Sequence, residues 1–279
     1  MFAAADFDLD AYLSRIGFTG PTAPTLDTVA RLVACHTQAI PFENLDPLAG
    51  RTVRLDIASL QAKLVAGRRG GYCYEHNLLA GHALAALGFR VTGLAARVRW
   101  NIPPAIVTPR THMLLHVEIR RRPYLVDVGF GGLTLTGVLA LEPDLEQETP
   151  HERFRLTRDG GDFLVEALVG GSWRPLYRFD LQPQAIADYE LASWYLCNNP
   201  RSQFTNTLMA ARSEPGRRLA LRNAEYAVHV LHGPTERRVL RSAAEIRQTL
   251  ETVFLTRVPE EPSIDAAFER LAAATPSAV

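Results

Sequence analysis

The residue pattern of this chain changes from helical to extended at Gly88. Before it, apolar residues recur at helical spacing in segments near residues 8–16, 25–40, 56–66 and 72–87. After it, short runs with strand character predict strands at 89–100, 113–119, 124–128, 154–157, 163–169, 173–179, 205–211, 217–221, 226–231 and 237–240, with helices at 183–197, 242–254 and up to about 274. Helices followed by strands, without regular βαβ alternation, predict an α+β fold.

Length and charge limit the number of domains and the classes of partner that this chain can have. At 279 residues the chain exceeds the usual size of one domain, so we expect two or three packed subdomains. Lys plus Arg and Asp plus Glu both number 30, and this zero net charge argues against nucleic acid and anionic membranes as partners. No apolar run is long enough to span a bilayer, and residues 1–10 lack the pattern of a signal peptide.

The chain has three cysteines, Cys35, Cys73 and Cys197, which is a low, odd number for a disulfide framework. Free thiols are typical of a reducing compartment, so we expect a cytoplasmic protein. Cys35 and Cys197 lie in apolar helical segments and are interpreted as packing residues, which is the commonest role of cysteine.

Cys73 has a different context. Gly70 and Gly71 precede it, and it falls in the first turn of the helix predicted at 72–87. Unpaired N–H groups and the positive end of the helix dipole favour a thiolate there, and Arg68 and Arg69 add positive charge nearby. A thiolate in this position can attack a carbonyl carbon.

A nucleophilic cysteine needs a base and a group that orients the base. His112 opens one predicted strand, and Asp127 lies near the end of the next. If the turn centres on residues 120–121, Asp127 pairs opposite Leu114 and His112 is its diagonal neighbour. If the turn centres on residues 121–122, His116 faces Asp127 instead, so hairpin geometry leaves both histidines open.

The two histidines also have a spacing that invites a metal-site interpretation. On a strand, however, His112 and His116 lie about 13 Å apart. No third ligand or zinc-type spacing accompanies them, so we expect no metal.

Several segments together resemble the arylamine N-acetyltransferase family. They are Ile40-Pro41-Phe42-Glu43-Asn44-Leu45, Arg69-Gly70-Gly71-Tyr72-Cys73-Tyr74-Glu75, Arg110-Thr111-His112-Met113-Leu114-Leu115 and Val126-Asp127-Val128-Gly129-Phe130-Gly131-Gly132. The order and spacing of Cys73, His112 and Asp127 also agree with the family. The likeness is strong over the first half of the chain and diffuse over the rest. It implies that His112, which follows an Arg-Thr dipeptide as in the family, is the base.

The resemblance implies an N-terminal helical bundle, a central β-barrel-like domain and a C-terminal α/β lid. The first two parts would resemble the core of papain-like cysteine proteases. We therefore predict a helical bundle with the cysteine at 1–88, a β-barrel-like domain with His112 and Asp127 at 89–200, and a lid at 201–279.

The resemblance also implies an activity. Acetyl-CoA would be the co-substrate, and acetyl would pass through Cys73 to arylamines, arylhydrazines or N-hydroxyarylamines by a ping-pong mechanism. Cys73, His112 and Asp127 would be catalytic. The substrate pocket would be lined by Phe42, Val98, Phe130 and Phe204, and the CoA path by Thr111, Gly129 and Gly131. Candidate cations for the CoA phosphates are Arg68, Arg69, Arg217, Arg218, Arg237 and Arg238.

Other functions share the Cys-His-Asp arrangement. A cysteine hydrolase would pass the acyl group to water, and an amide synthase of the same superfamily would form an amide without CoA. A binding module that keeps the fold but has no activity is a third alternative, and the presence of all three triad residue types argues against it. The sequence leaves the oligomeric state open, and a homo-oligomer remains compatible with it.

Overall fold

The computed structural model describes residue 2 and residues 6–274. The outer ends of the first and third predicted domains, at residues 1, 3–5 and 275–279, lie outside the described residues. The helices are α1 (Leu9–Arg15), α2 (Leu26–Ala39), α3 (Leu45–Leu48), α4 (Ile57–Leu60), the π-helix η1 (Gln61–Ala66), α5 (Cys73–Ala86), α6 (Ile186–Asn198), α7 (Gln203–Asn206), α8 (Ala243–Thr252) and α9 (Pro262–Ala273).

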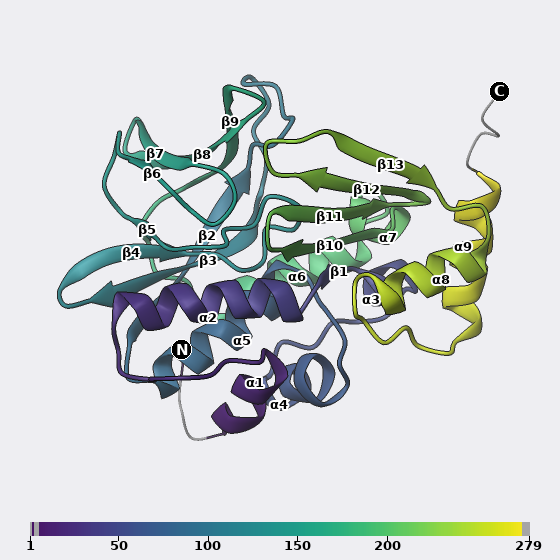
Figure 1. The fold of residues 1–279 in the computed structure, drawn as a ribbon, viewed down its shortest axis with the longest axis horizontal. Coiled ribbons are helices and arrows are strands. Elements are labelled where there is room, and N and C mark those ends of the chain that lie inside the picture. The colour runs from purple at the N-terminus through teal and green to yellow at the C-terminus, as the bar shows by residue number, and fades with distance from the viewer. Residues whose placement is uncertain (1, 3–5, 275–279) are drawn as a thin grey trace.

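The strands form two antiparallel sheets. Their bounds are β1 (Phe42–Glu43), β2 (Arg90–Val98), β3 (Arg110–Ile119), β4 (Arg122–Val126), β5 (Leu139–Ala140), β6 (Glu146–Gln147), β7 (Phe154–Asp159), β8 (Asp162–Val169), β9 (Ser172–Phe179), β10 (Met209–Glu214), β11 (Arg217–Arg222), β12 (Glu225–Val230) and β13 (Thr235–Val239). The larger sheet has the order β5-β4-β3-β2-β9-β8-β7-β6, and the smaller has the order β1-β10-β11-β12-β13. Figure 1 shows the helices of the first third below the two sheets, so the predicted α+β fold is confirmed.

Most boundaries follow local capping signals. Thr25 caps α2 by accepting a hydrogen bond from the Thr28 N–H, and Ser242 caps α8 in the same way. The prediction of a strand at 205–211 is partly wrong. Residues 203–206 form α7, and the strand begins only at Met209. Ser202 caps this short helix, and such a local hydrogen bond competes with extended pairing.

Helix α5 is buried along most of its length. Its buried residues include the polar Glu75, His76 and Asn77 as well as apolar side chains. One core contains α5 together with residues of α2, β3 and α6, including Val33, Leu115, Val117 and Leu196. A second core fills the space between the smaller sheet and helices α8 and α9, and a third lies within the larger sheet. Cys73, the first residue of α5, therefore rests on a fully packed support.

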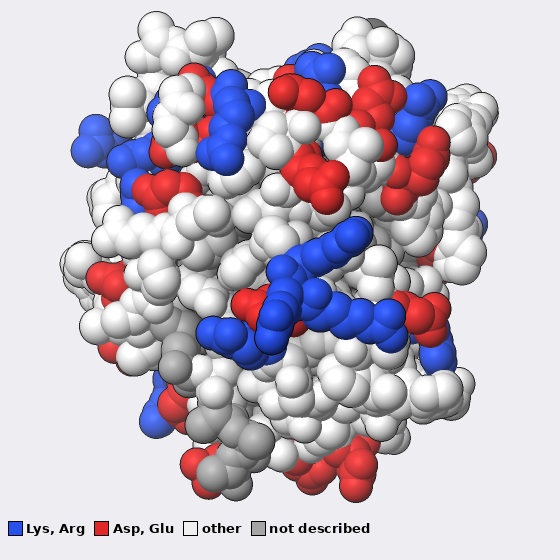
Figure 2. Space-filling view, turned by 90° about the vertical axis from the view of Figure 1, so that its left-hand side faces the viewer, with Lys and Arg blue, Asp and Glu red and all other residues white. Residues whose placement is uncertain are grey.

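The β3–β4 hairpin has the first of the two registers considered above. Ile119 pairs with Arg122, so the turn consists of Arg120 and Arg121. Both turn residues have positive φ, at 51° and 64°, which is the geometry of the two-residue turns that suit strand twist. The turn lies at the left of Figure 1, and Figure 2, which faces that end, shows a band of Lys and Arg side chains across the surface.

A chain of buried hydrogen bonds supports the segment before α5. His76 Nε2 lies 3.1 Å from the Pro41 carbonyl oxygen and 3.0 Å from that of Gly71. Carbonyl oxygens only accept, so this nitrogen carries the proton and His76 Nδ1 accepts from His36 Nε2 at 2.8 Å. His36 Nδ1 in turn accepts from the Tyr12 hydroxyl at 2.8 Å. Every donor has an acceptor only while both rings are neutral.

Acid is expected to destabilise the protein through this chain. Burial holds the pKa of His36 well below its usual value and lowers that of His76 to about 4. As the pH falls below about 6.5, the unfolded chain binds protons that the folded chain does not, so each histidine removes up to about 1.4 kcal/mol of stability per pH unit until its folded pKa is reached. Urea unfolding at several pH values measures this slope.

The variant His36→Gln is expected to flatten the slope, because Gln can accept from Tyr12 and donate to His76 without titrating. The control is His232→Asn, which removes an exposed histidine and keeps a residue that tolerates positive φ. An unchanged slope in His36→Gln would contradict the neutral-chain interpretation.

Candidate active site

The position of Cys73 depends on close backbone packing in front of α5. A Cβ atom at Gly70 would overlap the Pro41 carbonyl oxygen, and one at Gly71 would lie 2.5 Å from a Glu75 carboxylate oxygen. Only glycine fits at these two positions. Glu75 uses this space to accept a hydrogen bond from the Tyr72 N–H at 3.0 Å, which fixes the first turn of the helix.

A buried ion cluster surrounds the same turn. Arg69 donates to Glu43 Oε1 at 2.9 Å and lies 3.1 Å from Asp46 Oδ1. Lys63 lies 2.6 Å from both Asp46 and Glu75. The Arg69 side chain is thus committed to carboxylates, although the sequence placed it among the cations that hold CoA phosphates.

His112 and Asp127 form a buried pair. His112 Nε2 lies 2.7 Å from Asp127 Oδ2, and their side chains are 3% and 0% exposed. The other oxygen, Asp127 Oδ1, accepts from the Gly129 N–H at 2.9 Å and from the Asn77 amide at 3.1 Å. Burial alone would raise the pKa of Asp127, but His112 and these donors together lower it, so the carboxylate is ionised.

The ring of His112 connects this carboxylate to Cys73. Its Nε2 faces Asp127, which leaves Nδ1 for the thiol. Burial opposes the charged ring, but Asp127 and a hydrogen bond with Cys73 outweigh burial and raise the pKa of His112 to about 10. The Cys73 sulfur also lies 3.6 Å from the Thr111 carbonyl oxygen, next to His112 in β3, and Cys73 opens α5 at the positive end of the helix dipole.

His116 occupies a different position. It pairs with Leu125 in the β3–β4 ladder, two residues further from Asp127 along β4. It is half-buried, and burial lowers its pKa, in contrast to that of His112. The register, with its turn at residues 120–121, brings His112 and not His116 to Asp127.

Cys73 and His112 open into a cavity of about 560 Å³ between the two sheets. The residues predicted to line the substrate pocket and the CoA path all border this one cavity: Phe42, Val98, Thr111, Gly129, Phe130, Gly131 and Phe204. Trp100, Ile102 and Val169 extend its apolar wall, while Gln203, Arg222 and His229 add polar groups from the smaller sheet and α7. The cavity therefore combines an apolar wall with a polar rim.

The remaining candidate cations are spread over different surfaces. Arg218 borders the cavity, but its guanidinium is paired with Glu152 through contacts of 2.6 to 2.9 Å. Arg217 pairs with Glu214, and Arg237 and Arg238 lie on the exposed strand β13. Arg68 faces a separate cleft. Arg222, which the sequence analysis did not single out, borders the cavity.

Sequence reasoning missed two residues that hold the pair in place. The Asn77 amide donates to the carbonyls of Cys73 and Met113 and to Asp127, at 3.1, 2.8 and 3.1 Å. Its place one helical turn after Cys73, as a polar residue in an apolar helix, was a signal that could have revealed it. The buried ring of Tyr177 lies 4.9 Å from that of His112, and nothing local in the sequence marks it.

Within residue 2 and residues 6–274, no three His, Cys, Asp or Glu side chains gather in a way that could hold a metal ion. None of the helices in this part of the chain has the length and apolar character needed to cross a membrane.

Comparison with known proteins agrees with this geometry. A family model described as N-acetyltransferase matches residues 25–262. The arylamine N-acetyltransferase of Mycolicibacterium smegmatis is 45% identical over 251 residues, which cover 88% of this chain and 91% of that protein. The corresponding enzyme of Mycobacterium tuberculosis strain H37Rv is 43% identical and covers 97% of this chain and 98% of its own length.

Solved structures give the same result. The arylamine N-acetyltransferase of Mycobacterium marinum in complex with CoA superposes with a TM-score of 0.91 at 42% identity, covering 95% of this chain and 99% of that one. The fold and the matched family model define an N-acetyltransferase. Within this class, the chain belongs to the arylamine N-acetyltransferase family, as its motifs predicted.

Gly129 packs so closely against Cys73 that the backbone leaves no room for a side chain at this position. A Cβ atom at Gly129 would lie 2.8 Å from the Cys73 Cα and 2.8 Å from the Asn77 amide nitrogen. Gly129→Ala is expected to cost about 1–3 kcal/mol of stability through overpacking and to lower acyl transfer by displacing the thiol. Gly132→Ala is the matched control, since a Cβ there meets no atom within 4 Å. Equal activity and denaturation midpoints in the two variants would contradict this account.

Proposed function

We propose that this protein transfers acetyl from acetyl-CoA to aromatic amines by a ping-pong mechanism through acetyl-Cys73. The observation that carries the proposal is the contact of His112 with both Cys73 and the buried Asp127, where Cys73 and His112 border a largely apolar cavity. Acetyl-CoA as donor is supported by family membership and by the neighbouring structure solved with CoA. The three residues are proposed to act as nucleophile, proton carrier and orienting carboxylate.

In the first half-reaction the Cys73 thiolate attacks the acetyl carbonyl carbon. A tetrahedral intermediate forms, and backbone N–H groups at the start of α5 stabilise its oxyanion. The C–S bond to CoA then breaks, and the protonated His112 ring gives its proton to the departing CoA thiolate. The products are free CoA and a thioester on Cys73, with His112 neutral and Asp127 still ionised.

In the second half-reaction an amine nitrogen attacks the thioester. His112 removes the proton that the nitrogen loses, the C–S bond to Cys73 breaks, and the thiolate–imidazolium pair is restored. An aromatic amine is weakly basic and mostly neutral at pH 7, so its lone pair is available. The rings of Phe42, Phe130 and Phe204 offer an apolar wall for the aryl group.

Arylhydrazines and N-hydroxyarylamines fit the same site, because each joins an aryl group to a nucleophilic nitrogen or oxygen. N-hydroxyarylamines would be acetylated on oxygen. Amide synthesis without CoA and hydrolysis of the acyl-enzyme use the same three residues, and the experiment below separates these reactions from acetyl transfer.

The domain and cellular assignments accompany this proposal. We propose that residues 1–88 supply the nucleophile, residues 89–200 supply His112 and Asp127, and residues 201–279 act as a lid over the cavity. The smaller sheet and α7 contribute part of the cavity wall, which supports a lid role. A cytoplasmic location is supported by the free thiols of Cys35, Cys73 and Cys197.

Acetyl-CoA alone is expected to place one acetyl group on Cys73. Intact mass followed by peptide mapping measures the adduct, and a small arylamine should remove it while releasing the acetylated amine. Cys73→Ser should abolish the adduct, whereas Cys35→Ser, which replaces a half-buried free thiol, should form it normally. Adduct loss at the same rate with and without amine would indicate a hydrolase. No adduct on folded protein with a free thiol, and no CoA release, would count against acetyl-CoA as donor.

Asp127→Asn tests the orienting carboxylate. Loss of the negative charge removes the main support for a protonated His112, so the pKa of that ring should fall towards its ordinary value. The rate of Cys73 acetylation should drop by a factor of about 10²–10⁴. The loss of activity on the alkaline side of the pH profile should begin at a lower pH than in the wild type. Asp10→Asn on the exposed face of α1 is the control. A wild-type rate and pH profile in Asp127→Asn would contradict the assigned role.

A further inference from the structure

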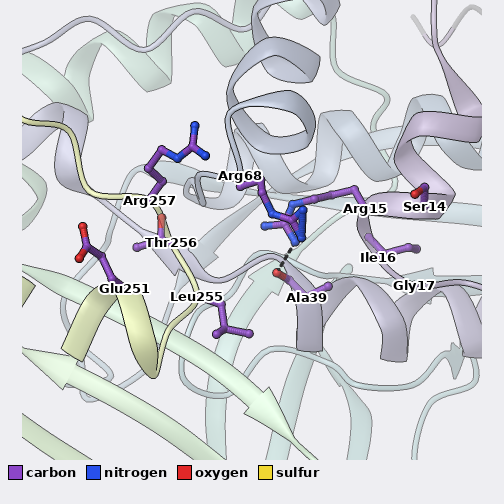
Figure 3. Close-up of a pocket in the computed structure, with 10 residues that line it drawn as sticks. All are labelled: Ser14, Arg15, Ile16, Gly17, Ala39, Arg68, Glu251, Leu255, Thr256 and Arg257. Carbon is purple, nitrogen blue, oxygen red and sulfur yellow. Dashed lines mark hydrogen bonds between the residues drawn. The ribbon is translucent and has the colours of Figure 1, made fainter. Parts of the chain in front are cut away.

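A second hollow lies apart from the cavity at Cys73. This cleft has a volume of about 760 Å³ and is bordered by α1, the end of α2 and the segment after α8. Figure 3 shows its lining residues, which are Ser14, Arg15, Ile16, Gly17, Ala39, Arg68, Glu251, Leu255, Thr256 and Arg257. None of them borders the cavity at Cys73.

The cleft carries an excess of positive charge. Three of its lining residues are arginines, and Glu251 is the only acid among them. Among the described residues, Arg15, Arg68 and Arg257 form none of the ion pairs within 4.0 Å, whereas Glu251 lies 3.9 Å from Arg247 outside the cleft lining. The charge of these three guanidiniums is therefore not balanced by nearby carboxylates of the described chain.

Arg15 has one nitrogen that points to a missing acceptor. Its Nε donates to the Leu64 carbonyl at 3.0 Å, and its Nη1 donates to the Ala39 carbonyl at 2.7 Å. Its Nη2 is buried and has no hydrogen-bond partner in the described structure. A buried guanidinium N–H without an acceptor is costly, and a bound water or anion can supply the acceptor.

Arg68 brings a second guanidinium to the same place. Figure 3 shows the Arg15 and Arg68 side chains converging beside the Ala39 carbonyl. Burial and the charge of Arg68 lower the pKa of Arg15 to about 10, which shows that the two like charges oppose each other. Two guanidiniums held together in this way are stabilised when an oxyanion lies between them.

We propose that this cleft binds a small phosphate-bearing anion, held by Arg15 and Arg68. Guanidinium groups match the oxygen spacing of phosphate, and the free Nη2 of Arg15 gains the acceptor that it lacks. The volume exceeds what a phosphate ion fills, so the cleft has room for the organic part of a phosphate ester. The exposed Ser14 and the Glu251 carboxylate offer partners for its hydroxyl groups.

The bound anion would stabilise a connection that reaches the nucleophile. The Arg257 N–H donates to the Arg68 carbonyl at 3.1 Å, and the Gly70 N–H donates to Thr256 Oγ1 at 3.1 Å. The cleft thus lies against two segments that hold each other, one from the lid and one that ends at Cys73. Ligand binding would stabilise this contact, because breaking it would dismantle part of the site.

Isothermal titration of the full-length protein with inorganic phosphate and with glycerol 3-phosphate tests the proposal. Ionic strength is matched with sodium chloride, and each titration is repeated with saturating CoA. Both ligands should bind with and without CoA, and the ester should bind more tightly because it fills more of the cleft. Equal affinities would identify the free phosphate ion as the ligand of the same site.

Variants locate the binding site. Arg68→Gln should weaken binding by about tenfold or more, since it removes a charge-assisted contact. Arg68 makes none of the described side-chain hydrogen bonds, and glutamine lacks a branched Cβ just as arginine does, so the φ of 51° at this position suits both residues equally. Arg90→Gln is the matched control, because the Arg90 side chain on β2 is 83% exposed, and this variant should bind both ligands with wild-type affinity. Arg257→Gln is a second cleft variant for use if Arg68→Gln fails to fold.

Three results would overturn the proposal. One is wild-type affinity in folded Arg68→Gln and Arg257→Gln. A second is an equal loss of affinity in Arg90→Gln, which would indicate a general charge effect. The third is binding that CoA abolishes, which would place the anion in the cavity at Cys73. These experiments measure anion binding and not acetylation of Cys73. A negative result therefore rejects the anion site without bearing on the proposed acetyl transfer.

Discussion

The start of α5 is held by buried charges, and the position of the Cys73 thiol depends on them. Removing an ion from water costs several kcal/mol, so buried charges persist only where each has a close partner. Arg69 and Lys63 meet that condition through carboxylates of Glu43, Asp46 and Glu75. Glu43 belongs to β1, which pairs with β10, so the same cluster also ties the helical third to the smaller sheet. Replacing one member by an uncharged residue would leave its partner unpaired, which is why the cluster acts as a unit.

The sequence was sufficient to predict those parts of the site that rest on local signals. Two glycines before a helix predict a close backbone approach and a cysteine at a helix start, and both are present. The choice between His112 and His116 needed the turn at residues 120–121. Two arginines in the left-handed region form that turn, and arginine carries none of the signal that Asn-Gly would have given. Family resemblance supplied what local chemistry could not.

Other features depend on contacts between segments far apart in the chain, and no local pattern reveals them. Arg218 looked available for a CoA phosphate until Glu152, 66 residues away, proved to hold its guanidinium. Tyr177 reaches His112 only because β9 lies next to β2 in the larger sheet. Asn77 joins α5, β3 and Asp127, so its role exists only after the sheet has packed on the helix. Long-range pairing, rather than weak propensity, limited the prediction.

The contrast between Arg68 and Arg69 shows how the backbone assigns different roles to adjacent identical residues. Arg68 has a φ of 51°, which turns its side chain away from the carboxylates that surround Arg69. Arg69 is neutralised within the chain, whereas Arg68 meets Arg15 with no acid between them. A left-handed conformation costs an arginine about 1–2 kcal/mol, and here it serves to end η1, because it lets the following Arg69 N–H donate to the Lys63 carbonyl at 3.1 Å. The same turn that ends this helix also brings the Arg68 guanidinium to the cleft, beside a buried N–H of Arg15 that has no acceptor.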